Sequence, residues 1–143
     1  MFNRLRSLDA GLLTLRISIG GFMLFGHGWG KLKQLFDGGN ANFPDPLGIG
    51  VQLSFASAAL AESVAAALIV VGLVNRLSTG ALAFTMAVAA FVVHGGDPFA
   101  KREMALLYLA GCVVLLLTGP GRYTLQAKLF RQPSNKIARW LLQ

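Results

Sequence analysis

Residues 51–74 read VQLSFASAALAESVAAALIVVGLV, and this stretch decides the fold. It contains a single charged residue, Glu62. An apolar run of about 20 residues is long enough to cross the hydrocarbon core of a bilayer as a helix. Isolated strands cannot cross it, because lipid offers their backbone groups no hydrogen-bond partners. The stretch is therefore predicted to be a transmembrane helix.

Three further apolar runs complete the predicted fold, at about residues 8–30, 77–94 and 102–118. We expect an all-α membrane protein, an antiparallel four-transmembrane-helix bundle over residues 1–123. A basic amphipathic tail over residues 124–143 is expected to lie on the membrane surface. Turns rich in glycine, proline and asparagine separate the runs.

The composition supports lipid as the main solvent of this chain. Of its 143 residues, 55% are hydrophobic and 13% are charged, whereas a soluble domain has about 25% charged residues. The net charge of +7 could indicate nucleic acid. We exclude this partner because the basic residues stand at the ends of the apolar runs, where they orient membrane helices.

The distribution of basic residues predicts the orientation. With four spans, both termini and the Asn75-Arg76 hairpin share one side of the membrane. That side holds Arg4, Arg6, Arg76, Arg122, Lys128, Arg131, Lys136 and Arg139, and the other holds Lys31, Lys33, Lys101 and Arg102. Basic residues concentrate on the cytoplasmic side, so both termini are predicted to be cytoplasmic and the protein to lie in a bacterial inner membrane.

Two charged residues lie inside predicted spans, Arg16 and Glu62. Such charges cost about 2.5–3.5 kcal/mol each on insertion scales, so they face the bundle and find partners. We expect an Arg16–Glu62 ion pair between the first two helices. The pair either only locks the helices together or forms a proton site, in which Glu62 binds the proton and Arg16 sets its affinity.

Small residues predict where the first two helices meet. The first run contains several glycines, including the spacing Gly26-x-x-x-Gly30, and the second is rich in alanine. Small residues let helix backbones approach closely in lipid. We therefore place these two helices at the tight centre of the bundle.

Further polar and aromatic side chains are expected to converge on a pocket that opens to the outer side. They are His27, Lys31, His94, Glu103, Trp29 and Tyr108. Two histidines at similar depth favour a ligand or proton site. No metal is expected, because the chain has no His-x-x-x-His or Cys/His spacing.

Several segments together resemble the DoxX family of small bacterial membrane proteins over about residues 8–130. They are LFGHGWGKL at 24–32, AE at 61–62, GLVNRL at 72–77, HGGDPF at 94–99, and the stretch from Glu103 to LLTGPGRY at 116–123. The resemblance implies four transmembrane helices and redox work around quinones. Relatives are linked to a thiosulfate:quinone oxidoreductase, to quinone-detoxifying operons, and to a complex that recruits superoxide dismutase and a sulfurtransferase.

We therefore expect a membrane component of a quinone/quinol-linked redox system that binds a small apolar ring compound in the outward-facing pocket. Glu62, His27 and Arg16 are the candidate catalytic residues, and His94 and its pocket neighbours are the candidate ligand contacts. The sequence has no haem, iron–sulfur or flavin motif, so a quinone is the expected cofactor, and electrons need either a partner protein or the ligand itself as their carrier. The alternative is a non-enzymatic scaffold or assembly factor that recruits a redox partner. Catalysis by the chain itself and formation of a homo-oligomer stay open.

Overall fold

The computed structural model describes residues 2–129, and every regular element within that range is helical. The helices form four long rods, and short π-helical segments, named η, interrupt the first two rods and end the third. The first rod is α1 (Phe2–Met23), η1 (Leu24–Gly28) and α2 (Trp29–Phe36); the second is α3 (Val51–Leu60), η2 (Ala61–Ala65) and α4 (Ala66–Val71); the third is α5 (Asn75–Val88) and η3 (Ala89–Val93); the fourth is α6 (Phe99–Thr118), followed by the short α7 (Leu125–Leu129).

Three rods are long and apolar enough to cross a membrane, over Leu5–Phe36, Val51–Val71 and Asn75–Val93. The chain is thus an all-helical membrane protein. The fourth rod, α6, has 20 residues but carries charged residues at positions 101–103 in its first turns. Of the predicted amphipathic tail, α7 is described, and residues 130–143 lie outside the described residues.

The rods differ from the predicted helices mainly at their ends. The first continues to Phe36, beyond the predicted end near residue 30. The predicted Asn75-Arg76 hairpin is instead the first turn of α5. The turn before it begins at Gly72, which has a φ of 71° and closes α4 as a left-handed cap. The Leu73 amide donates to the Leu68 carbonyl at 3.0 Å, as in a Schellman motif.

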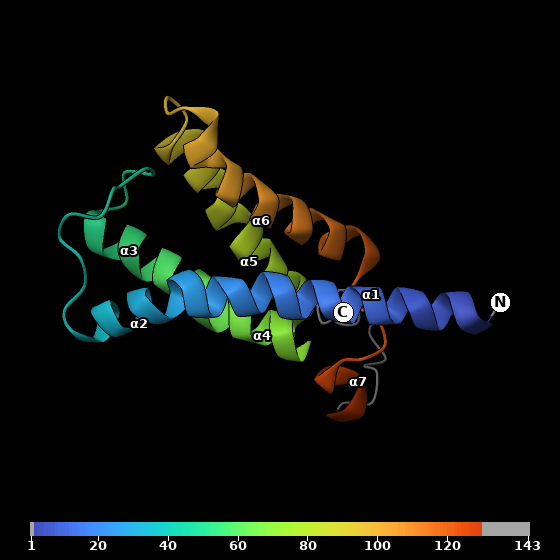
Figure 1. Cartoon of the computed structure of the whole chain (residues 1–143). Helices are drawn as coiled ribbons and strands as arrows, with labels where there is room; N and C mark the ends of the chain where they lie inside the picture. Colours follow the sequence, from blue (N-terminus) through green and yellow to red (C-terminus); the bar gives the residue numbers. More distant parts are fainter. Residues whose placement is uncertain (1, 130–143) are drawn as a thin grey trace.

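The four rods surround one core. Helix α1 packs against α4 and α6, and α5 packs against α6, α4 and η2. The fully buried side chains between them include Met23, Ile69, Leu82, Cys112 and Leu115. Figure 1 shows that α5 leaves the second rod beyond η2, so α3 and the upper part of α5 diverge. This divergence makes room for a cavity between the second and third rods.

The first two rods cross at Gly20 and Gly28. A Cβ at Gly20 would lie 2.6 Å from the Ala66 carbonyl oxygen, and one at Gly28 would lie 2.0 Å from the Glu62 carbonyl oxygen. The predicted close approach of the first two helices through glycines therefore occurs at these two positions, whereas Gly26 and Gly30 take no part in it, because a Cβ at either position would meet no atom within 4 Å. Gly28 therefore fixes where the first rod meets the segment that carries Glu62.

Candidate functional site

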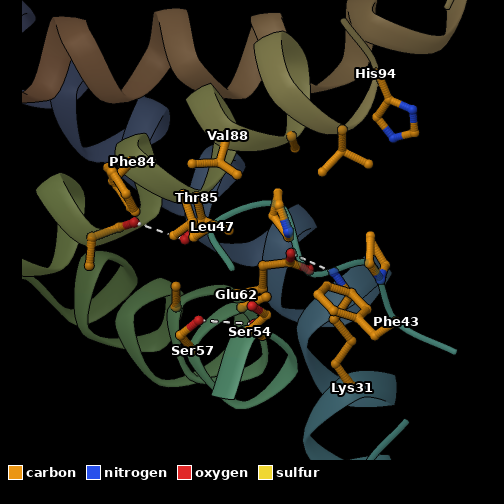
Figure 2. A pocket seen from close by; sticks show the side chains of 17 residues that line it. Lys31, Phe43, Leu47, Ser54, Ser57, Glu62, Phe84, Thr85, Val88 and His94 are labelled. Carbon is orange, nitrogen blue, oxygen red and sulfur yellow. Dashed lines mark hydrogen bonds and ion pairs between the residues drawn. The ribbon is translucent and has the colours of Figure 1, made fainter. Parts of the chain in front are cut away.

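A cavity of about 470 Å³ lies between the second and third rods, beneath the loop that joins α2 to α3 (Figure 2). Its walls are mainly apolar, with a few polar side chains. The residues that line it are Lys31, Phe43, Pro44, Pro46, Leu47, Ser54, Ser57, Ala58, Ala61, Glu62, Ala81, Phe84, Thr85, Val88, Ala89, Val93 and His94. A cavity of this size, apolar with few polar groups, is typical of sites that enclose a small molecule.

An ion pair between Lys31 and Glu62 lies at the inner end of the cavity. Lys31 Nζ is 2.5 Å from Glu62 Oε1, and Glu62 is only 4% exposed. The Lys31 ammonium also lies 5.6 Å from the centre of the Phe43 ring. Within residues 2–129, Glu62 Oε2 has no hydrogen-bond partner although it is buried. A buried carboxylate oxygen without a donor is costly, so a ligand that brings a hydrogen-bond donor to this atom would be stabilised.

The expected Arg16–Glu62 ion pair is wrong. Arg16 is fully buried at the other end of the rods, where its Nη1 donates to the carbonyls of Ile69 at 3.2 Å and Val70 at 3.1 Å. Its Nη2 donates to the Tyr123 carbonyl. The last carbonyls of a helix lack helical donors and carry partial negative charge, so the end of α4 can satisfy a cation.

The register of the first two rods explains why Glu62 pairs with Lys31 and not with Arg16. Gly28 lies against Glu62, and Lys31 lies one helical turn beyond Gly28, within reach of that carboxylate. Arg16 precedes Gly28 by 12 residues, about 18 Å along the helix. That distance carries Arg16 past Glu62 to the end of α4.

Asp45 holds the loop that roofs the cavity. Its Oδ1 accepts hydrogen bonds from the Ile49 amide at 3.1 Å and the Ser54 hydroxyl at 2.6 Å, and its Oδ2 accepts one from the Gly50 amide at 2.8 Å. The Ser54 hydroxyl, with these amides, lowers the pKa of Asp45 below its ordinary value. The carboxylate therefore ties the roof, which includes Phe43 and Leu47, to the start of α3.

His94 lies at the outer end of the cavity and is held by Asp97. Its Nδ1 is 2.9 Å from Asp97 Oδ2, and Lys101 Nζ is 3.7 Å from Asp97 Oδ1. The hydrogen bond from His94, with the charge of Lys101, lowers the pKa of Asp97. A carboxylate on Nδ1 orients the imidazole and leaves Nε2 as the nitrogen available to other partners.

The other predicted site residues lie outside the lining of this cavity. His27 is exposed, and its ring lies nearly perpendicular to the buried Tyr108 ring, with 6.1 Å between the ring centroids. Trp29 is 64% exposed, and Glu103 is exposed on the first turns of α6. Among residues 2–129, no three His, Cys, Asp or Glu side chains lie close enough together to hold a metal ion.

The family model of DoxX matches residues 11–95, more than half of the chain. The chain belongs to the DoxX family. The DoxX match includes every residue that lines the cavity and ends before α6. No curated protein and no solved structure gives a match.

Sequence reasoning missed the roof and the wall on the third rod. Asp45, which precedes Pro46 and lies just before a helix, carries a recognisable turn and capping pattern that could have identified it. Phe84 and Thr85 offer no such signal, because a phenylalanine or threonine in an apolar run is ordinary. Their place in the cavity depends on how far α5 diverges from α3.

Proposed function

We propose that this DoxX protein binds a quinone or quinol in the cavity, as a component of a redox system in the bacterial inner membrane. The observation that carries the proposal is the buried Glu62 Oε2, which has no donor within the described part of the chain and lines an apolar cavity beside an ammonium group. A quinol hydroxyl would supply the missing donor, and the flat ring suits the apolar walls.

The two charged side chains divide the recognition between them. The Lys31 ammonium has three N–H donors and uses one on Glu62, so another can donate to a ring carbonyl oxygen. Glu62 Oε2 can accept a proton from the ring hydroxyl when the quinol is the ligand. Conversion between quinone and quinol moves two electrons and two protons. Glu62 takes or gives one proton, water at the outer end of the cavity takes or gives the other, and the electrons pass to or from a partner redox protein.

The proposal includes the placement in the membrane. We place α6 as a fourth span, with its charged start at the interface, so that both termini lie in the cytoplasm. The excess of basic residues near the termini supports this orientation. The roof loop and His94 then lie on the periplasmic side.

Binding of a tail-free quinone to the purified protein in lipid nanodiscs tests the proposal. Glu62→Gln and Lys31→Gln are compared with Asp37→Asn and Lys33→Gln, which change exposed residues outside the cavity. Loss of a charge-assisted hydrogen bond costs about 1.5–3 kcal/mol, so the first two variants should bind at least about tenfold more weakly. The two controls should bind like the wild type.

Equal affinity in all five proteins would overturn the proposal. It would then favour the alternative of a non-enzymatic scaffold that recruits a redox partner. Co-purification of partner proteins with the full chain and with a chain that ends at residue 123 would test that alternative, and it would show whether a scaffold holds its partner through the basic tail or through the outer loops.

A further inference from the structure

The cavity reaches the surface of the protein between two candidate membrane spans. Ser57 on α3 and both Ala81 and Phe84 on α5 line the cavity and are exposed. Ala61 and Glu62 line it and are buried. The cavity therefore deepens from an exposed rim to the ion pair, and in Figure 2 Phe84 and Val88 stand across it from Ser54 and Ser57.

The rim lies at the depth of the hydrocarbon core. Ala81 is six residues after the start of α5, which is about 9 Å along the helix. His94 lies thirteen residues further, about 20 Å. The lining of the cavity therefore extends from the middle of the third rod to its outer end. Because α3 and α5 belong to the candidate spans Val51–Val71 and Asn75–Val93, lipid rather than water faces this rim.

The two formally charged residues of the lining, Lys31 and Glu62, lie together at one part of the cavity, whereas His94 lies at its outer end. Lys31 and Glu62 form the deep polar end, and the wall on the third rod is formed by Ala81, Phe84, Val88, Ala89 and Val93, with Thr85 as its polar member. The Thr85 hydroxyl is occupied, because it donates to the Ala81 carbonyl at 3.0 Å. The Ser57 hydroxyl on the rim is also occupied, because it donates to the Ser54 carbonyl at 2.9 Å. A ligand placed here would meet charge at one end and a mainly apolar rim that is exposed to lipid at the other.

We propose that the ligand reaches the cavity sideways from the bilayer, with its ring beside Glu62 and Lys31 and a long hydrocarbon tail leaving between α3 and α5. This inference rests on the proposed function and adds the class of ligand, a tailed membrane quinone. A cavity of about 470 Å³ holds the ring, and the exposed rim lets the tail continue into the surrounding lipid.

Two probes with the same ring test the inference, one without a tail and one with a ten-carbon alkyl tail. Ala81→Trp fills the rim on α5, and Ser57→Phe fills it on α3. Ala110→Trp is the control, because Ala110 is exposed on α6 and lies outside the cavity lining. Dissociation constants are measured in nanodiscs and expressed as the concentration of probe within the lipid. Thermal unfolding checks that each variant is folded.

The tailed probe should bind each rim variant at least about tenfold more weakly than the wild type, while the tail-free probe changes by less than about threefold. The Ala110→Trp control should leave both affinities unchanged. If the tailed probe binds the rim variants as well as the wild type, or if both probes lose affinity equally, the tail does not lie between α3 and α5 and the inference is overturned while quinone binding stands. If neither probe binds the wild type, the proposed function itself fails.

Discussion

Replacing Gly28 by alanine should push the first two rods apart at the site itself. The new Cβ would lie 2.0 Å from the Glu62 carbonyl oxygen and 2.8 Å from Ser63 Cα. Both are backbone atoms and cannot rotate away. Ordinary contact begins at 3.4 Å, so going from 2.0 to 3.4 Å requires a shift of about 1.4 Å at this crossing. Overpacking of this kind costs about 1–3 kcal/mol.

Gly21→Ala is the matched control, because a Cβ at Gly21 meets no atom within 4 Å. Both changes replace a helical glycine by alanine, which favours the helix by about 1 kcal/mol in each case. The difference in the free energy of unfolding between the two variants therefore measures the cost of the clash where the two rods cross. We expect Gly28→Ala to be less stable than Gly21→Ala by about 1–3 kcal/mol in detergent unfolding. Its quinone affinity should fall about tenfold, because the carboxylate moves away from Lys31. Equal stability and equal affinity of the two variants would refute the close crossing and its role in placing Glu62.

Two further predictions separate the cavity from the rest of the bundle. Arg16→Met should lower the free energy of unfolding by at least about 2 kcal/mol, because buried carbonyls lose their donor. The folded variant should keep its quinone affinity. An affinity loss as large as that of Glu62→Gln would show that Arg16 takes part in the site. The lowered pKa of Asp45 means that its carboxylate stabilises the roof fully above its ordinary pKa of 3.8, and this contribution is lost as the pH falls through the lowered value. Asp45→Asn should therefore remove part of the fall in melting temperature that acid causes. If the melting temperature of this variant falls with pH as much as that of the wild type, the role of Asp45 in holding the roof is contradicted.

The all-helical membrane fold could be predicted because hydropathy and turn chemistry act locally. The run around Glu62 and the glycines at 72 and 119 mark the rods without knowledge of packing. The register between rods is not local. The first rod offers several glycines of similar surroundings, and only the packed structure selects Gly20 and Gly28 over Gly26 and Gly30. The sequence-based prediction assumed a different register between the first two rods, and it therefore paired Glu62 with Arg16 instead of Lys31.

The π-helical segments explain a second failure. A regular helix of 3.6 residues per turn would place His27 and Lys31 on one face, as the sequence predicts. The segment η1 covers Leu24–Gly28, and a π turn holds an extra residue, which rotates the following residues by about 100° relative to a regular helix. His27 is therefore exposed while Lys31 faces the cavity. Periodicity alone does not reveal such a turn.

The central claim, that a quinone ring lies beside Glu62, is tested most directly by photolabelling. A quinone that carries a photoactivatable group on its ring is bound to the protein in nanodiscs, and the attachment sites are located by mass spectrometry. We expect labels on cavity residues of α3 and α5, such as Ala58 and Thr85, and a strong decrease of this labelling in Glu62→Gln. Labels confined to the lipid-facing surfaces of α1 and α6, or labelling unaffected by Glu62→Gln, would contradict the claim.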